Sequence, residues 1–203
     1  KARLHYIAIE PYPLEADQMD RFLLNFRELD IERKELVSMY PKPHIGFHRV
    51  WSTDNKITLT FIVGPADEAL AELEAEVDLW FLNGFPLKVN PDIWSETVCS
   101  ELARLSKPDA HLISICDDEK IQSRLAKAGF YLSKKNVFRD KFGVLKGKFI
   151  GKSKPQYLAP WFRPPLPLKS QGTIGIIGAG LAGCAMAEAL ARRGKKVLLF
   201  DQQ

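Results

Sequence analysis

The chain has 203 residues, of which 46% are hydrophobic and 27% are charged, and its formal net charge is +4. This composition is typical of a soluble globular chain and excludes a disordered or collagen-like one. The length suits one large domain, or one domain and part of another, and argues against a complete two-domain enzyme. No run of about 18 apolar residues is present to cross a membrane, and no apolar signal segment opens the chain, so we expect a cytoplasmic protein without a membrane partner.

The charge is unevenly distributed along the chain. Residues 120–172 contain thirteen basic residues and one acidic residue, a net charge of +12, so the remainder carries −8. Residues 66–119 alone have a net charge of −10. A basic stretch of this kind favours contact with a polyanion such as nucleic acid. Charge alone leaves an alternative equally open, in which the lysines are solvated positions on edge strands and discourage aggregation.

Strands and helices alternate over the first three quarters of the chain. The pattern predicts strands at residues 4–10, 57–63, 77–82 and 112–116, helices at 19–29, 67–74, 91–105 and 121–128, a short helical segment near residue 37, and two paired strands at 130–137 and 144–150. Short connections between alternating elements predict an α/β fold, with a doubly wound parallel sheet covered by helices on both faces and an antiparallel pair at its end.

The last fifty residues predict a linker and the start of a second domain. Residues 151–172 contain five prolines among lysines and show no periodicity, so we expect a stiff, extended connection. Residues 173–203 then form one strand, one helix and a second strand. We expect this unit to continue into a larger fold beyond the end of the chain.

Three glycines, Gly178, Gly180 and Gly183, have G-x-G-x-x-G spacing between the predicted strand and an alanine-rich helix. In this context the first glycine permits a tight turn, the second lets a pyrophosphate approach the backbone, and the third allows close packing of helix on strand. Asp201 follows Gly178 by 23 residues, where a carboxylate can bind ribose hydroxyls. The pattern predicts a dinucleotide site, without separating FAD from NAD. The alternative is a glycine-rich unit built for close packing alone.

Cysteine and histidine residues point to no metal site. Cys99, Cys116 and Cys184 are widely spaced in apolar surroundings, which favours buried packing thiols. His44 and His48 have no third ligand nearby, and the proline and glycine around them indicate a surface loop.

Two further places have the character of a site in a doubly wound fold. Glu10 ends the first predicted strand, where a carboxylate suits an adenosine ribose, although a solvent-facing strand end is an equally good interpretation. The segment WFLNGF, residues 80–85, is followed by NPDIW, residues 90–94, where the carboxyl end of a strand meets the next helix.

These segments, together with LHYIAIEPYPL, ARLSKP, KAGF, APWF and the glycine pattern, resemble the family of bifunctional tRNA 5-methylaminomethyl-2-thiouridine biosynthesis proteins, MnmC. The resemblance covers nearly the whole chain. It implies a class I methyltransferase half that uses S-adenosylmethionine, followed by an FAD-dependent oxidoreductase half. The oxidoreductase would remove a carboxymethyl group from the modified wobble uridine of tRNA, and the methyltransferase would methylate the resulting aminomethyl group.

The resemblance also assigns boundaries and roles. Residues 1–150 would be a methyltransferase-like domain that lacks its first strand and glycine loop, residues 151–172 a linker, and residues 173–203 the start of the FAD domain. Asn83 would lie at the catalytic position and Glu10 would bind S-adenosylmethionine. FAD would bind Gly178, Gly180, Gly183 and Asp201, and tRNA would contact Lys134, Lys135, Arg139, Lys141, Lys146 and Lys148.

Several residues depart from the family pattern. Asn83 replaces an aspartate expected to hold the substrate amine, and an amide carries no charge and cannot act as a base. Pro65 replaces an aspartate positioned for the adenine, and Asp109 with Ala110 replaces a Gly-Gly turn. We therefore expect this stretch alone to be inactive, and a degenerate methyltransferase half in the full-length protein stays open. Two alternatives remain: a non-catalytic tRNA-binding platform fused to a flavin oxidoreductase, and a generic FAD or NAD dehydrogenase.

Overall fold

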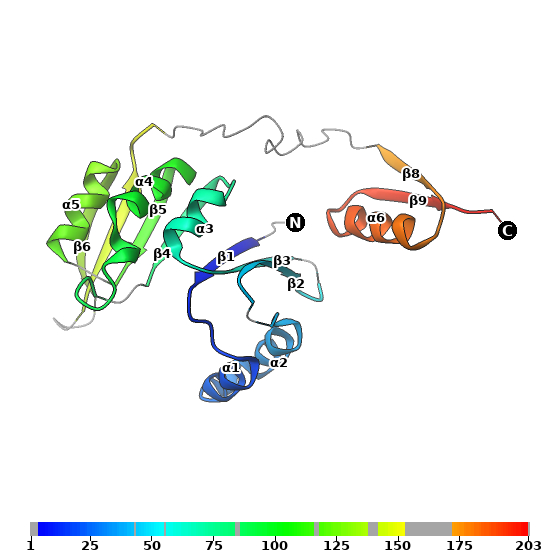
Figure 1. The fold of residues 1–203 in the computed structure, drawn as a ribbon, viewed down its shortest axis with the longest axis horizontal. Coiled ribbons are helices and arrows are strands. Elements are labelled where there is room, and N and C mark those ends of the chain that lie inside the picture. Colours follow the sequence, from blue (N-terminus) through cyan, green and yellow to red (C-terminus); the bar gives the residue numbers. More distant parts are fainter. Residues whose placement is uncertain are drawn as a thin grey trace. The chain divides into compact units, whose positions relative to one another are not determined.

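The computed structural model describes residues 4–42, 44–54, 56–83, 86–115, 118–137, 142–152 and 172–202, with the backbone alone for 134–137 and 142–143. The chain divides into two units, Lys1–Gln156 and Tyr157–Gln203 (Figure 1). Most of the predicted linker lies outside the described residues.

The first unit begins with a three-stranded sheet in the order β1-β3-β2, formed by β1 (Leu4–Glu10), β3 (Ile57–Val63) and β2 (Gly46–Trp51). β1 runs parallel to β3, and β2 runs antiparallel to it. The sequence analysis missed β2 because Gly46 indicates a loop. Gly46 adopts a φ of +123°, opens the strand and pairs with Val63. His48 therefore lies on a strand rather than in the expected loop.

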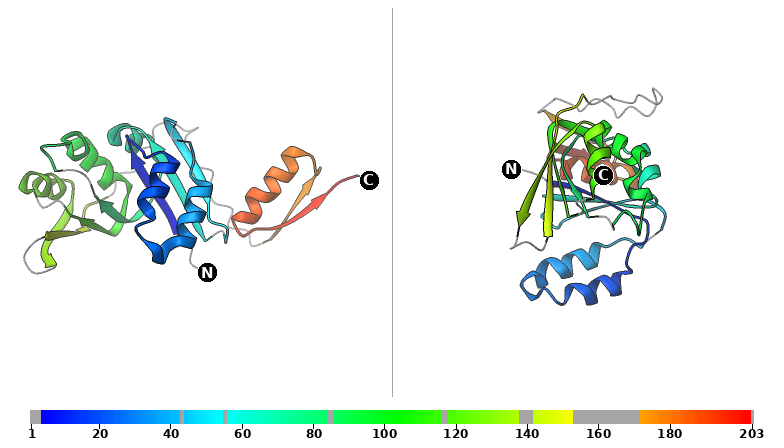
Figure 2. Two further views of the ribbon diagram at one scale, coloured as in Figure 1. Left: turned by 90° about the horizontal axis from the view of Figure 1, so that it is seen from below. Right: turned by 90° about the vertical axis from the view of Figure 1, so that its left-hand side faces the viewer.

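Two helices and a 3-10 turn separate β1 from β2. They are α1 (Ala16–Leu23), η1 (Arg27–Leu29) and α2 (Asp30–Met39), so the helix predicted over 19–29 ends early and the second helix is longer than expected. Arg33 forms ion pairs with Asp20 of α1 and Asp30 of α2. The rings of Tyr40 and Phe61 lie 5.4 Å apart. This contact helps to hold the helical pair on one side of the sheet (Figure 2).

A second sheet has the order β4-β5-β7-β6, with β4 (Val77–Leu82), β5 (Ser106–Ser114), β7 (Phe142–Phe149) and β6 (Phe130–Val137). β4 and β5 are parallel, and the other pairs are antiparallel. The α/β class and the antiparallel pair are confirmed. The single sheet expected from the sequence is instead present as two sheets, and the parallel strands β1 and β4 each lie at the edge of one.

The remaining helices of this unit are α3 (Ala66–Glu72), the 3-10 turn η2 (Asp92–Trp94), α4 (Glu96–Leu105) and α5 (Glu119–Lys127). The helix predicted over 91–105 is interrupted at Ser95, whose side chain caps α4 by accepting a hydrogen bond from the Val98 amide at 3.2 Å. Within the described residues, no helix has the length and apolar character that crossing a membrane requires.

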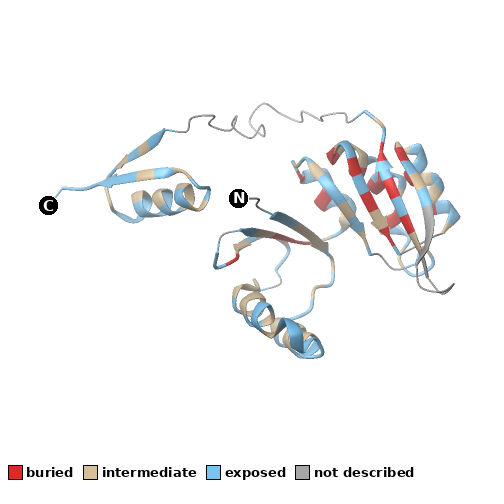
Figure 3. Ribbon diagram, turned by 180° about the vertical axis from the view of Figure 1, so that it is seen from behind, coloured by how far each residue is buried: buried red, intermediate tan, exposed pale blue. Residues whose placement is uncertain are grey.

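The core lies between the second sheet and its helices, where the buried residues concentrate (Figure 3). Leu112 and Leu145 of the sheet, and Ile121 and Leu125 of α5, are each at most 1% exposed. Burying each such side chain contributes about 1.5–3 kcal/mol. The Arg104 guanidinium donates to the carbonyls of Leu70 and Leu73 at 2.8 and 2.9 Å. It thereby binds carbonyl groups at the end of α3 and joins α3 to α4.

The cysteine prediction is confirmed at one position and wrong at another. Cys99 lies in the core, and burial raises the pKa of its thiol to about 11, which makes it unreactive near neutral pH. Cys184 is exposed. Cys116 lies outside the described residues.

The second unit contains β8 (Thr173–Ile177), α6 (Leu181–Arg192) and β9 (Lys196–Phe200). β8 and β9 are parallel neighbours, so the predicted strand, helix and strand are confirmed. Gly194, with a φ of +75°, follows the helix in the left-handed conformation that glycine adopts readily. No described residue of this unit is buried.

A hydrogen-bond chain crosses the three strands of the first sheet. Thr60 is 1% exposed, and its hydroxyl oxygen accepts a hydrogen bond from Arg49 Nε at 3.0 Å. The same hydroxyl lies 2.8 Å from His5 Nε2. Because the guanidinium can only donate, the Thr60 hydroxyl can donate onward to an unprotonated His5 Nε2. Burial and the charge of Arg49 both lower the pKa of His5.

This arrangement predicts a loss of stability in mild acid. The unfolded state binds a proton at His5 below a pH of about 6.5, whereas the folded state resists it, so the free energy of unfolding falls as the pH falls through this range. Urea unfolding of His5→Gln should show a weaker pH dependence than wild type below pH ~6.5. The control is His44→Gln, in an exposed segment. Identical pH dependence in His5→Gln and wild type would contradict the prediction.

Candidate functional site

The turn between β8 and α6 brings two strand ends together. Gly178 has a φ of +100°, in the left-handed region that favours glycine, and its amide donates to the Phe200 carbonyl at 2.7 Å. Ile177 and Phe200 are paired residues at the ends of the two parallel strands. The backbone after β8 is therefore held against the carboxyl end of β9.

Gly183 and Gly180 meet different surroundings. A Cβ added at Gly183 would lie 1.8 Å from the carbonyl oxygen of Gly178 and 2.9 Å from its carbonyl carbon. These are backbone atoms, so any side chain at this position would force the helix away from the turn. A Cβ added at Gly180 would meet no atom within 4 Å. Gly180 therefore leaves open space at the beginning of α6, where helix amides favour an anion.

A cleft of about 590 Å³ lies at this carboxyl edge and is lined by Gly175, Ile177, Gly178, Phe200, Asp201 and Gln202. Gly178 and Asp201, 23 positions apart in the sequence, thus meet in one cleft. Asp201 Oδ1 accepts a hydrogen bond from the Gln202 amide at 2.9 Å, which orients the carboxylate. A glycine turn open to a phosphate, with a carboxylate at the neighbouring strand end, has the chemistry that a dinucleotide requires.

In the first unit, Glu10 lies at the end of β1 beside the end of β3. Glu10 pairs with Val63, and the Gly64 amide donates to the Glu10 carbonyl at 3.4 Å. The Glu10 side chain is exposed, and its Oε1 accepts from the Tyr12 amide at 3.0 Å. Pro65 precedes α3 without a side-chain cap. This edge therefore offers a carboxylate at Glu10 but no side-chain acceptor at Pro65.

Asn83 follows β4 at the carboxyl edge of the second sheet and is exposed. Leu82 pairs with Ser114, and the fully buried Ser114 Oγ donates to the Leu82 carbonyl at 2.9 Å. Trp80 Nε1 donates to Ser106 Oγ at 2.9 Å, which in turn donates to the Leu102 carbonyl of α4 at 2.7 Å. Asn83 therefore extends from a firmly anchored strand. Gly84 and Phe85 lie outside the described residues.

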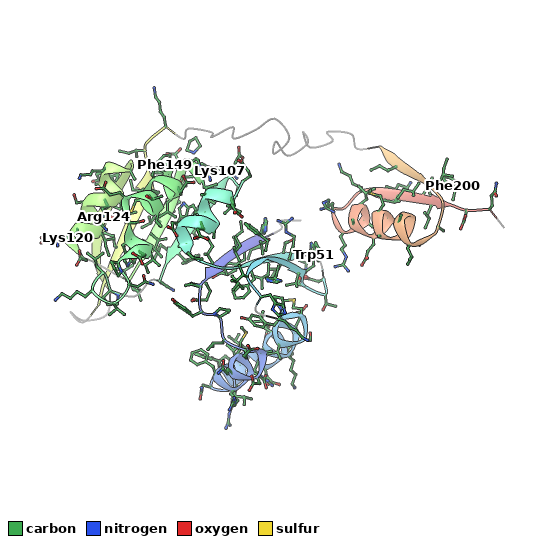
Figure 4. The ribbon with its side chains drawn as sticks, in the orientation of Figure 1. Trp51, Lys107, Lys120, Arg124, Phe149 and Phe200 are labelled. Atoms are coloured by element: carbon green, nitrogen blue, oxygen red, sulfur yellow. The ribbon has the colours of Figure 1, made fainter. Side chains whose placement is uncertain are left out.

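The NPDIW segment that follows is anchored in the core. Trp94 is 3% exposed, and its carbonyl accepts a hydrogen bond from Arg124 Nη1 at 2.6 Å. Arg124, which is labelled in Figure 4, belongs to α5. Pro86 O accepts hydrogen bonds from the amides of Val89 and Asn90. Residues 86–90 thus form a hydrogen-bonded turn, and the segment after it is anchored to α5 through the Trp94 carbonyl.

The predicted donor-site residues fall into two groups. Glu10 belongs to the sheet β1-β3-β2, and Asn83 belongs to the sheet β4-β5-β7-β6. Among the described residues, no hydrogen bond joins the two strand ends. The structure therefore places Glu10 and Asn83 at the ends of strands in two different sheets.

Four of the predicted tRNA-contact residues, which we call the basic face, belong to the antiparallel strands. Lys146 and Lys148 are exposed on β7, while Lys134 and Lys135 belong to β6 and pair with Leu145 and Val144. Arg139 and Lys141 lie outside the described residues.

Asp109 is a partner that the sequence analysis missed. Its Oδ1 lies 2.9 Å from Lys148 Nζ, and Lys148 lowers the pKa of this carboxyl. Asp109 has a φ of +66°, so an aspartate adopts a left-handed conformation where the resemblance leads us to expect glycine. In the sequence, only the pair Pro108-Asp109 could have suggested a turn. Nothing in the sequence predicts the register of β5 against β7, on which the contact between Asp109 and Lys148 depends.

Replacement of Gly183 and of Gly180 by alanine should have different effects. Gly183→Ala should lower the thermal unfolding midpoint of the second unit, because the new methyl group meets a backbone carbonyl. Gly180→Ala should leave that midpoint nearly unchanged, because the methyl group meets no protein atom. The same substitution should weaken binding of an added dinucleotide, because the methyl group enters the space that a pyrophosphate would approach. Both quantities can be measured on the intact protein by differential scanning fluorimetry with and without FAD or NAD. Equal midpoints for Gly183→Ala and wild type would refute the packing argument.

Comparison with known proteins agrees with this geometry. A family model described as S-adenosyl-L-methionine-dependent methyltransferase matches residues 27–149, and one described as NAD(P)-binding Rossmann-like domain matches residues 176–203. A crystal structure of MNMC2 from Aquifex aeolicus is similar in fold, with a TM-score of 0.56 and 17% identity. The similarity covers 76% of this chain and 46% of that one.

Two curated relatives show the extent of the sequence similarity. The tRNA 5-methylaminomethyl-2-thiouridine biosynthesis bifunctional protein MnmC of Pseudomonas savastanoi pv. phaseolicola is 36% identical over 206 residues, covering 100% of this chain and 31% of the relative. The protein of the same name from Pseudomonas syringae pv. tomato is 37% identical over 205 residues, covering 99% and 31%. The chain thus spans about a third of the length of these relatives. Because the methyltransferase match extends over more than half of the chain, the chain belongs to the family of S-adenosyl-L-methionine-dependent methyltransferases.

Proposed function

We propose that the chain is a segment of a bifunctional enzyme that modifies the wobble uridine of tRNA, of the kind that the MnmC name describes. The observation that carries this proposal is the extent of the similarity: 36% identity runs over the whole chain, including both the methyltransferase-like domain and the glycine turn. A generic dehydrogenase would account for the second unit alone. An activity on tRNA is consistent with the cytoplasmic location expected from the sequence.

The methyltransferase half is proposed to methylate the aminomethyl group of the modified uridine. S-adenosylmethionine supplies an electrophilic methyl group when bound. Glu10, exposed at the end of β1, is suited to accept hydrogen bonds from ribose hydroxyls. Asn83, exposed at the end of β4, can orient the amine through its carbonyl oxygen but cannot take its proton. The amine proton must therefore leave to another acceptor such as water.

The second unit is proposed to begin an FAD-binding domain, whose flavin would supply the oxidising power to remove a carboxymethyl group. Gly180 would admit the pyrophosphate and Asp201 would hold the ribose, with Gly178 and Gly183 keeping strand, turn and helix together. The choice of FAD over NAD rests on the resemblance to the bifunctional family, because the glycine turn serves either cofactor.

We also propose that the first unit is completed by a strand that precedes Lys1. The parallel strands β1 and β4 are each paired on one side only within the described residues. Parallel sheets are normally buried and continuous, and open edges with free amides are a liability. One parallel strand paired with both edges would join the two sheets, bring the ends of β1 and β4 to a common edge, and provide the missing glycine loop. The relatives are long enough to contain it.

Two residues favour a second candidate function, in which the methyltransferase half binds tRNA without methylating it. Asn83 lacks the charge of the expected aspartate, and Pro65 lacks a side-chain acceptor for the adenine. Titration of the full-length protein with S-adenosylmethionine separates the two. Binding followed by methyl transfer to tRNA bearing an aminomethyl uridine supports the enzyme. Binding of tRNA without binding of the methyl donor supports the platform.

The position of Asn83 predicts a gain of activity. Asn83→Asp restores a carboxylate able to attract and deprotonate an amine, so methyl transfer by the full-length protein should rise by roughly 10²-fold or more. The rate of radiolabel transfer from S-adenosylmethionine to tRNA measures it. Asn25→Asp adds the same charge at an exposed position between α1 and η1 and should have no such effect. An unchanged rate in Asn83→Asp would remove this residue from the catalytic role.

The basic face predicts salt-dependent binding of tRNA. Lys134→Glu with Lys135→Glu should weaken binding by the full-length protein and reduce the slope of log K against log salt concentration by about 1 for each phosphate that a lysine no longer neutralises. Filter binding at several salt concentrations measures both effects. Lys34→Glu, on α2, is the control and should leave the slope unchanged. Unaltered binding in the double variant would exclude this face.

A further inference from the structure

The second sheet has one covered face and one uncovered face. Leu112, Leu145 and Phe149 belong to the covered face and pack into the core with α4 and α5. On the opposite face, the strand register aligns residues of all four strands in two rows. The rows are Leu79, His111, Lys148 and Tyr131, and Phe81, Ile113, Lys146 and Ser133. Every member except the half-buried Ile113 is exposed.

The two halves of this face differ in chemistry and in strand direction. The parallel pair β4 and β5 carries Leu79, Phe81 and Ile113, which are apolar. Parallel strands are normally covered on both faces, so this half needs a protein cover. The antiparallel pair β7 and β6 carries Lys146 and Lys148 on β7 together with Tyr131 and Ser133 on β6. Antiparallel strands can keep one face in water, so this half can remain accessible to a ligand.

We propose that the β7-β6 half of this face is a platform for unpaired nucleotides of RNA, with the Tyr131 ring as the stacking surface and Lys146 and Lys148 as phosphate contacts. This inference rests on the proposed function and specifies which part of the RNA is bound. Tyr131 is 65% exposed, so most of its surface is available to a base. Aromatic rings on β-sheets that stack bases, with cations beside them, are a recurrent means of binding single strands.

Strand pairing and one ion pair define where the two lysines lie around Tyr131. Tyr131 of β6 lies directly opposite Lys148 of β7. Lys146 is two residues from Lys148 on β7 and lies on the same face of the sheet. Asp109 Oδ1 holds the Lys148 ammonium at 2.9 Å, which limits the movement of that side chain. Ser133, opposite Lys146, adds a hydroxyl that can bind phosphate or ribose. The face thus combines one ring, two ammonium groups and one hydroxyl on two adjacent strands.

The same composition argues against a protein partner on this half. Lysine is depleted in the centres of protein interfaces, because burying its charge is costly. Residues 120–172, which include both strands, have a net charge of +12. Charge complementarity therefore favours RNA, and the exposed bases of a tRNA loop are the part that a ring can stack.

The test compares two RNAs of equal length, a synthetic stem-loop and a fully paired duplex, in binding to the full-length protein. Tyr131→Ala should weaken binding of the stem-loop by about tenfold and leave the duplex nearly unchanged. Its salt dependence should match wild type, because both lysines that bind phosphate are retained. Tyr131→Phe should restore binding, since the ring is kept. Lys146→Glu should weaken both RNAs and reduce the salt slope by about 1.

The control is Tyr12→Ala, which removes a tyrosine that is 85% exposed in the segment after β1. If wild type binds the stem-loop and Tyr131→Ala binds it equally well, the platform is refuted while the proposed function stands. If wild type binds neither RNA, the proposed function itself fails. If Tyr131→Ala lowers the unfolding midpoint of the full-length protein and Tyr131 resists nitration there, a protein segment covers the face and the inference is overturned.

Discussion

In a parallel sheet, the backbone amides and carbonyls of each strand need hydrogen-bond partners on both sides. The arrangement of the first unit depends on this requirement. β1 and β4 each satisfy only one side, and the two candidate donor-site residues, Glu10 and Asn83, lie at the ends of these two strands. The site is therefore divided along the same line as the sheet. Each strand end is nevertheless anchored by a hydrogen bond. The Gly64 amide donates to the Glu10 carbonyl, and the buried Ser114 hydroxyl donates to the Leu82 carbonyl.

The second unit obeys a different constraint, the close approach of a helix to a turn. Gly183 lies so near the Gly178 carbonyl that no side chain fits, whereas Gly180 faces open space. One glycine is thus required by packing within the protein, and the other leaves room for a ligand. The first unit joins strands from distant parts of the chain, whereas the second pairs β8 with β9 across the single helix α6, so its glycine turn and its carboxylate come together within thirty residues.

Local patterns in the sequence predicted the features that depend on neighbouring residues. The glycine turn and the helix ending before Gly129 follow from glycine positions, and the strand ending at Glu10 follows from an apolar run that stops before Pro11 and Pro13. The sequence analysis missed β2, because Gly46 suggests a loop and only pairing with β3 makes a strand there. It also missed the alignment of Tyr131 with Lys148, because that alignment depends on the register between β6 and β7. Cys184, predicted to be buried from its apolar neighbours, is exposed because few residues surround it in so small a unit.

The left-handed backbone at Asp109 restricts the substitutions that this chain can accept. Glycine and asparagine are the residues that share this conformation most readily, and neither carries a charge. Replacement by either would keep the path of β5 but release Lys148, and replacement by glutamate would keep the charge at the expense of the backbone. Aspartate is therefore the residue type that meets both demands. In a set of natural variants, the identity of position 109 would report whether the ammonium at position 148 is held or mobile.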